Sequence, residues 1–285
     1  MASINPGYMG YAKIGEGIVR FQDANITVRQ EINAPEIVMG NYDRVVYTYA
    51  TAEVGGSISG PVTENFSSDA AGGIWEWATQ RDQTCGGLES NSVDLYYFCG
   101  NGGKSRSFQN MFVNSLNFSC SAGDIAQFSL DVLGKGPSSD ITWGEYGTKQ
   151  DLVEKLVTWD VVSVGVSLPD FEGDFDQDAF SSFDLTISNN LETVYAIHEN
   201  ADYFPFDIVP GVRSVSGSLS VYNIPEVNGA DDYGAFEADQ IGTMTFDIGS
   251  GTLTAKVQFH RVEPSLSTGP IISTVGFTGV GIQGF

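Results

Sequence analysis

A short pattern that occurs twice in the chain decides its fold: Val54-Gly55-Gly56-Ser57-Ile58-Ser59 and Val215-Ser216-Gly217-Ser218-Leu219-Ser220. In both copies apolar residues alternate with small polar ones. A period of two is typical of a β-strand that buries one face. Because the second copy follows the first at an offset of 161 residues, the pattern predicts two equivalent strands, one in each half of the chain.

Two further matches extend the repetition. An offset of 159 aligns Phe21, Ile26, Thr27, Val28 and Ile32 with Phe180, Leu185, Thr186, Ile187 and Leu191. Near the ends of the halves, allowing one residue of slip, Gly123, Ile125, Phe128, Leu130 and Gly134 match Gly269, Ile271, Val275, Phe277 and Gly281. Three matches in one order predict a duplicated domain, and hence a ring-forming or pseudo-symmetric protein rather than a catalyst.

The bulk composition favours strands. The chain has 285 residues, enough for two cores of about 140 residues each, and its 34 Gly, 18 Phe and 12 Tyr are more typical of strands and turns than of helices. We therefore expect an all-β fold with minor α content. It would consist of two tandem β-sandwich or barrel domains, residues 1–140 and 141–285, each with one short helix.

The expected strands cover most of both halves. In the first half they span 17–21, 24–32, 44–58, 93–99, 108–113, 116–120 and 125–133, and in the second 183–197, 209–222, 242–248, 252–262 and 271–280. Helical spacing predicts short helices within 69–81 and 233–240. The segment 148–159 fits a linker helix, although its end fits a strand over 157–168 equally well. Trp75 and Trp77, two apart in a helix, should leave at least one ring exposed or at an interface.

The charge is strongly acidic, with 13 Lys and Arg against 36 Asp and Glu and a net charge of −23. Such a surface argues against nucleic-acid binding through phosphates. Carboxylates occur at every second position of one segment, at Asp170, Glu172, Asp174, Asp176 and Asp178. An extended chain would present all five on one exposed face. A calcium loop of the EF-hand type does not fit, because Ala179 and Leu185 stand where it needs Gly and Glu.

No motif in the sequence supports an enzyme, a cofactor or a metal site. The cysteines Cys85, Cys99 and Cys120 have no metal-binding spacing and are expected to be reduced thiols, although a bridge between Cys85 and Cys99 stays open. His198 and His260 have no His or Cys partner at ligand spacing. We find no signal peptide and no apolar run of about 20 residues, so we expect a protein made in a cytosol without a membrane anchor.

The second half carries a longer motif. Residues 182–195 read Ser-Phe-Asp-Leu-Thr-Ile-Ser-Asn-Asn-Leu-Glu-Thr-Val-Tyr, and residues 208–219 read Ile-Val-Pro-Gly-Val-Arg-Ser-Val-Ser-Gly-Ser-Leu. This stretch resembles the tail tube proteins of tailed bacteriophages. The motif positions are Asn189, Asn190, Leu191, Glu192, Tyr195, Pro210, Gly211, Arg213 and Gly217. Residues 112–119, 123 and 128–136 resemble the closing hairpin of the same family. The first half lacks the Asn-Asn-Leu-Glu and Pro-Gly-x-Arg elements.

The resemblance implies a β-sandwich whose inner strands join those of neighbouring subunits in a barrel. Rings of six such domains would stack into a tube. A two-domain chain would then form a trimer with pseudo-sixfold symmetry, with a hexamer as the alternative. Partners would be other tail proteins, such as the tape measure and a sheath, and DNA would pass through without specific binding. Aspartates 170–178 are candidates for an acidic lumen or for the joint between rings. Alternative functions are a hub, baseplate or tail-terminator protein of the same fold, or an extracellular carbohydrate-binding or adhesive sandwich.

Overall fold

The structure is a computed structural model that describes residues 11–15, 17–33, 48–63, 73–79, 87–96, 104–142, 156–167, 180–196, 203–222, 241–247, 252–260 and 272–282. Almost all of this part is β-strand, as predicted. The elements of the first half are β1 Tyr11–Ile14, β2 Gly17–Arg20, β3 Asp23–Asn33, β4 Thr48–Pro61, α1 Ile74–Thr79, β5 Asn91–Tyr96, β6 Lys104–Ser121, β7 Gln127–Gly134 and β8 Ser138–Thr142. Those of the second are β9 Ser163–Ser167, β10 Phe180–Ser188, β11 Leu191–Val194, β12 Asp207–Pro210, β13 Ser214–Tyr222, β14 Ile241–Asp247, β15 Thr252–Phe259 and β16 Ile272–Ile282.

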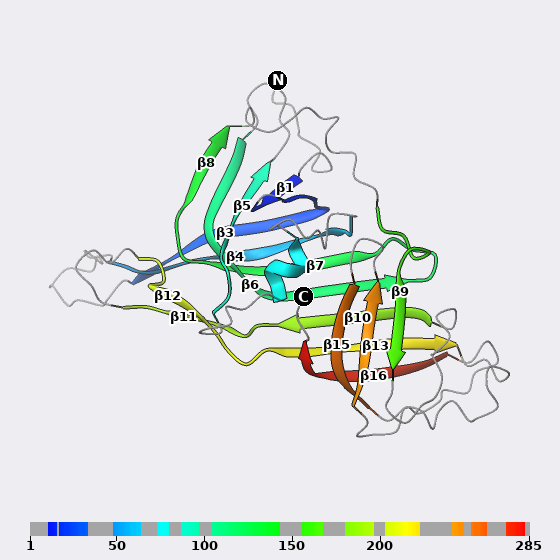
Figure 1. Ribbon diagram of the computed structural model, residues 1–285. Coiled ribbons are helices and arrows are strands. Elements are labelled where there is room, and N and C mark those ends of the chain that lie inside the picture. Colours follow the sequence, from blue (N-terminus) through cyan, green and yellow to red (C-terminus); the bar gives the residue numbers. More distant parts are fainter. Residues whose placement is uncertain are drawn as a thin grey trace, which may run out of the picture.

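Most strands belong to one antiparallel sheet of 14 strands, and β11 and β12 form a separate hairpin. The central strands β3, β4, β7, β6, β10, β13 and β16 run across the molecule in Figure 1, whereas β5 and β8 above, and β15, β14 and β9 below, run at a steep angle to them. The buried Phe183 of β10 contacts Phe246 of β14, with ring centroids 5.2 Å apart. The sheet therefore folds over itself and encloses the core between its central and outer strands.

The order of the strands is repeated. In the first strand set, defined as β1, β3, β4, β5, β6 and β7, the spatial order is β1-β5-β6-β7-β4-β3. In the second strand set, β9, β10, β13, β14, β15 and β16, it is β9-β14-β15-β16-β13-β10. Each strand occupies the same place in the chain order of its set as in the sheet. The two halves thus share one topology.

The registers agree with two of the three sequence matches. β3 pairs Val28 with Val54 of β4, and β10 pairs Ile187 with Val215 of β13. These are the pairs that offsets of 159 and 161 make equivalent.

The third match selects the right strands, β7 and β16, but its residue pairing is wrong. Leu130 lies opposite Ile58, and the equivalent Leu219 lies opposite Val275. Leu130 therefore corresponds to Val275 rather than to Phe277. A shift of two residues keeps the same side chains on the same face, so alternation alone does not detect it.

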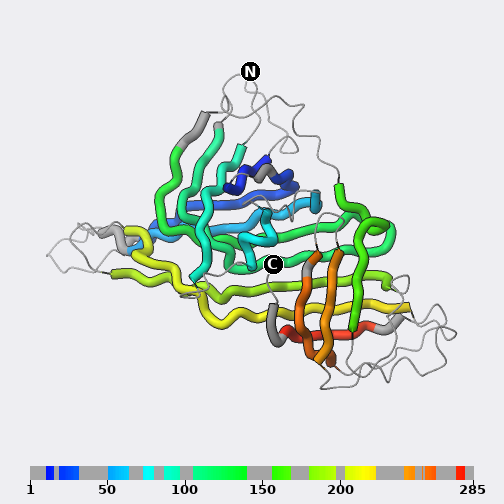
Figure 2. Tube along the Cα trace, in the orientation of Figure 1, coloured from blue at the N-terminus to red at the C-terminus, as the bar shows by residue number. Residues whose placement is uncertain are grey.

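The two strand sets meet at one continuous pairing, which we call the internal joint: residues 182–188 of β10 lie beside residues 115–121 of β6. Figure 2 shows β6 and β10 side by side at the centre of the trace. The core is also continuous here, because Phe118 of β6 contacts Phe183 of β10 at 5.0 Å between ring centroids. The division into domains 1–140 and 141–285 stays a prediction.

Helix α1 lies within the predicted 69–81 segment. Both Trp75 and Trp77 are 3% exposed, so the expectation of an exposed ring is wrong. α1 is a single short turn of chain against β6, and Trp77 reaches away from it to donate its indole N–H to Glu89 O at 3.2 Å. Residues 156–158 are extended, with Leu156 bridging Thr63, which supports the strand interpretation of this part of the linker. Residues 148–155 and 233–240 lie outside the described ranges.

Candidate functional site

The face of the central strands that points away from the core is polar along its whole width. One row of cross-strand partners crosses β3, β4, β7, β6, β10, β13 and β16: Asp23, Ser59, Ser129, Asn117, Thr186, Ser216 and Thr278. None of these side chains is buried. The opposite face along the same strands carries Ile58, Leu130, Leu116 and Ile187, all at most 1% exposed. We call the first surface the polar face.

A second row of short polar side chains lies on the polar face beside the first. It contains Asn25, Ser57, Asp131, Ser115, Ser188 and Ser214. Hydrogen bonds connect neighbouring strands: Ser115 Oγ donates to Asp131 Oδ2 at 2.9 Å. Across the internal joint, Asn117 Nδ2 donates to Asp184 Oδ2 at 2.8 Å and to Thr186 Oγ1 at 3.0 Å.

Charge on the polar face is mainly negative. By the alternation of the strands, its described carboxylates are Asp23, Glu31, Glu53, Asp131 and Asp184, and its cation is Arg29. The rest of the surface consists of hydroxyl and amide groups. Such a face holds water well and offers few cations to a polyanion.

Asn189 is the central residue of the motif and closes the internal joint. Its side chain is fully buried and donates to Ala78 O of α1 and to Val113 O of β6, both at 3.0 Å. Its Oδ1 accepts from Arg213 Nε at 2.9 Å, and its backbone N–H donates to Asn114 O at 2.7 Å. Because every bond goes to a group that would otherwise be buried without a partner, Asn189 fixes the end of β10 to the first strand set.

Other motif residues build the turn beside Asn189. Leu191 N–H donates to Asn114 Oδ1 at 3.0 Å. Asn190 has a positive φ of 50°, and its side chain donates to Val212 O at 2.6 Å. Gly211 approaches so closely that a Cβ there would lie 2.6 Å from Asn190 O, and Pro210 ends β12 directly before it. These residues are structural.

Gly217 is a close-approach position that both halves share. A Cβ at Gly217 would lie 2.1 Å from Asp184 O, and one at the equivalent Gly56 would lie 1.7 Å from Asn25 O. Asn25 and Asp184 are themselves equivalent at the offset of 159. Both strand sets therefore need glycine here.

The hairpin of β11 and β12 extends beside the ends of β3 and β4 (Figure 1). Lys135 forms an ion pair with Asp207, and this hydrogen bond lowers the pKa of the Asp207 carboxyl. Tyr195 OH donates to Ala52 O at 3.4 Å. Burial, together with the charge of Glu53, raises the pKa of Tyr195. Glu192 is exposed. The hairpin is thus tethered to the first strand set at both of its strands.

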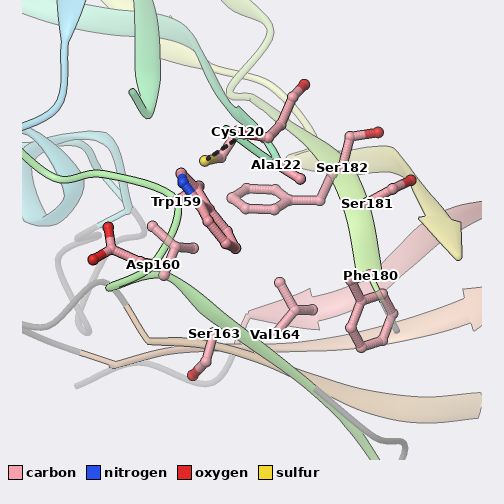
Figure 3. Close-up of a pocket in the computed structure, with 12 residues that line it drawn as sticks. Cys120, Ala122, Trp159, Asp160, Ser163, Val164, Phe180, Ser181 and Ser182 are labelled. Atoms are coloured by element: carbon pink, nitrogen blue, oxygen red, sulfur yellow. Dashed lines mark hydrogen bonds between the residues drawn. The ribbon is translucent and has the colours of Figure 1, made fainter. Parts of the chain in front are cut away.

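A cavity of roughly 410 Å³ lies at one end of the internal joint, where the ends of β6, β9 and β10 meet the linker. Figure 3 shows Cys120, Trp159 and Phe180 among the residues around it. Burial, and then the charge of Asp124, raise the pKa of the Cys120 thiol. A protonated thiol is a weak nucleophile, and the lining includes no His or Lys that could act as its base.

Several predicted features lie outside the described residues, among them Asp170, Glu172, Asp174, Asp176, Asp178, Cys85, Cys99 and His198. Within the described ranges, no group of three His, Cys, Asp or Glu side chains could hold a metal ion. None of the helices found there is long and apolar enough to cross a membrane.

Comparison with known families gives one match, to the family model for the phage tail tube protein, over residues 6–279. The chain belongs to the phage tail tube protein family. A comparison with curated proteins gives no match. Family membership makes the protein a structural component of the phage tail, in the virion, that assembles into a tube with other tail proteins. The match also includes the first half, where the sequence resemblance rests on fewer residues.

The polar face was not predicted from the sequence, although a signal for it exists. Ser214, Ser216, Ser218 and Ser220 occupy every second position of β13. Serine is a poor core residue, so this run marks a strand with one wet face. The same alternation in β10 gives Ser182, Asp184, Thr186 and Ser188.

Proposed function

We propose that the polar face lines the channel of the tail tube. The observation that carries the proposal is the pair of short polar rows across adjacent strands. A channel for DNA must be wettable, must be free of bulky side chains, and must avoid cations that would bind phosphates. Serine, threonine and asparagine with a few carboxylates meet these requirements.

The negative charge of the protein supports passage rather than binding. A net charge of −23 repels a polyanion within the Debye length of about 10 Å at ordinary salt. DNA would then move through without specific contacts. The acidic segment from Asp170 to Asp178 is a second candidate for the channel wall or for the joint between rings.

The repeated strand order supports a ring built from repeated units. Each chain would supply two domains, residues 1–140 and 141–285. Three chains would then complete a ring with pseudo-sixfold symmetry, and rings would stack into the tube. A hub, baseplate or terminator role would use the same fold in fewer copies, so the copy number per virion separates these roles from the tube.

Electron microscopy of the purified protein at high concentration tests the assembly. We expect hollow tubes of uniform width built from stacked rings. Particles that stay monomeric under all conditions would contradict the proposal.

Charge reversal tests the channel lining. Ser214→Lys and Ser216→Lys together place two cations on the polar face, where they would bind passing phosphates. We expect tubes to form and DNA release from assembled phage to slow. The matched control, Ser139→Lys with Ser167→Lys, changes two exposed serines of β8 and β9, outside the central strands. Equal release from both variants would remove the polar face from the channel.

Neutralising Asp174, Asp176 and Asp178 to asparagine tests the acidic segment separately. If the segment lines the channel, assembly is unchanged and DNA passage slows. If it lies at the joint between rings, tube length or polymerisation changes instead. Wild-type behaviour in both measurements would exclude both roles.

A further inference from the structure

The outer edge of β3 is open in the described part of the sheet. β3 pairs with β4 along one side, and no described strand lies along the other. Its equivalent, β10, is flanked on both sides, by β13 and by β6. The same position in the fold is therefore covered in the second strand set and uncovered in the first.

Side chains at equivalent positions record this difference. Ile187 of β10 is 1% exposed, whereas Val28 of β3 is 36% exposed. Asn189 is buried, and Gln30 at the same place is exposed. An apolar side chain and a row of backbone groups on an open edge are a template for pairing with another strand.

The complementary edge lies on β15, the equivalent of β6. β5 pairs with β6 only as far as Met111, after which β10 takes the place beside β6. β14 pairs with β15 only as far as Gln258, and in the described residues no strand then continues along that edge towards His260.

His260 corresponds to Asn114, the residue that receives the end of β10. Phe259 lies opposite Phe277 as Val113 lies opposite Val132, and these partners are equivalent because they flank Gly217 and Gly56. His260 follows Phe259 as Asn114 follows Val113. Asn114 O accepts the N–H of Asn189, so the carbonyl of His260 is the equivalent acceptor.

We propose that the open edge of β3 pairs with the β15 edge at His260 of a second copy of this chain, in the register of the internal joint. Gln30 of one copy then lies opposite His260 of the next, and the second copy covers Val28. The two edges differ, so the contact is head-to-tail and leads to a closed ring or an open filament. This inference rests on the proposed tube function and names the surfaces that would build its ring.

A proline at position 28 tests the β3 edge. Because Asn189 directs its N–H towards β6, alternation points the N–H of Ile187 the same way, and that of the equivalent Val28 towards the open edge. Proline removes an outward donor without removing a bond to β4, and edge strands tolerate it there. We expect Val28→Pro to abolish ring and tube formation in analytical ultracentrifugation, whereas Val28→Thr, which keeps the donor and the branched side chain, assembles. Normal assembly of Val28→Pro would overturn the inference.

Disulfide trapping tests the register even if the proline variant unfolds. Gln30→Cys and His260→Cys are made as separate proteins, with the three native cysteines replaced by serine. Oxidation of the equimolar mixture should give a covalent dimer of the two proteins, and oxidation of either protein alone should not.

The outcomes separate the two proposals. If the wild-type protein forms tubes and the mixture gives no covalent dimer, the inference fails and the tube function stands. If wild-type protein forms neither rings nor tubes, the proposed function fails and the inference fails with it.

Discussion

β10 and β3 are equivalent strands in different surroundings. β10 lies between two neighbours and ends at the buried Asn189, while β3 has one neighbour in the described sheet and ends at the exposed Gln30. Ile187 and Val28, at the same position of the two strands, differ from 1% to 36% in exposure. The comparison shows that the repeated pattern specifies a strand with two usable edges, and that the chain fills both edges only once.

The largest expected effect comes from the buried side of this comparison. Ile187→Ala leaves a cavity in the continuous core, and we expect the free energy of unfolding to fall by about 2–5 kcal/mol in urea denaturation. Val28→Ala is the matched control, because its partly exposed side chain should contribute about 1 kcal/mol or less in the monomer. Similar losses for both variants would mean that β3 is covered in the monomer too.

Asn189 should follow closely. Asn189→Ala removes two donors and one acceptor from buried partners, and we expect a loss of about 2–3 kcal/mol in unfolding free energy. Gln30→Ala, at the equivalent exposed position, should change stability by less than about 0.5 kcal/mol. If Asn189→Ala is as stable as the wild-type protein, the hydrogen bonds of Asn189 do not hold the internal joint.

The repeated glycine sharpens what the two halves have in common. Gly217→Ala and Gly56→Ala both push a methyl group into a backbone carbonyl, so each should lower the unfolding free energy by about 1–3 kcal/mol. Gly276→Ala serves as the control, since its Cβ would meet only His260 at 3.8 Å or beyond. A large loss for one glycine and none for the other would show that the strand sets differ in packing at this position.

The smallest effect concerns the hairpin that reaches from the second strand set to the first. The pKa of Asp207 is lowered in the folded state by Lys135. Its contribution to stability is therefore present above the ordinary carboxyl pKa and is lost as the pH falls through the lowered value. Both side chains are partly exposed, so we expect less than about 1 kcal/mol. Asp207→Asn should be less stable than wild type in urea denaturation at pH 7 and equally stable at pH 2; a constant difference at both pH values would contradict this explanation.

Much of the fold could be predicted from local patterns. Alternation identified the strands on both sides of the internal joint, and helical spacing placed α1 around Ile74 and Trp75. The offsets of 159 and 161 identified equivalent residues, because they compare segments that carry glycine and threonine as well as apolar positions. The third match was wrong by two residues, because only a partner strand distinguishes shifts that preserve the face.

The candidate site was less predictable. The motif residues Asn189, Gly211 and Arg213 were recognised as a family pattern, but their roles depend on Ala78 and Asn114, which lie far away in the sequence. The polar face has a sequence signal in the alternating serines of β13. That signal becomes a surface only when seven strands are placed in register, because each strand contributes just a few hydroxyl groups.

By itself the sequence determined the class of fold, the duplication and the family, since all three depend on which residue types recur at which spacing. The tertiary structure decided which edge is covered, which face stays wet and which asparagine is buried. The physical reason is that hydrogen bonds between strands and the burial of apolar side chains depend on partners more than 60 residues apart, such as Asn117 and Asp184. Local periodicity orients a side chain, and only a neighbouring strand determines what it contacts.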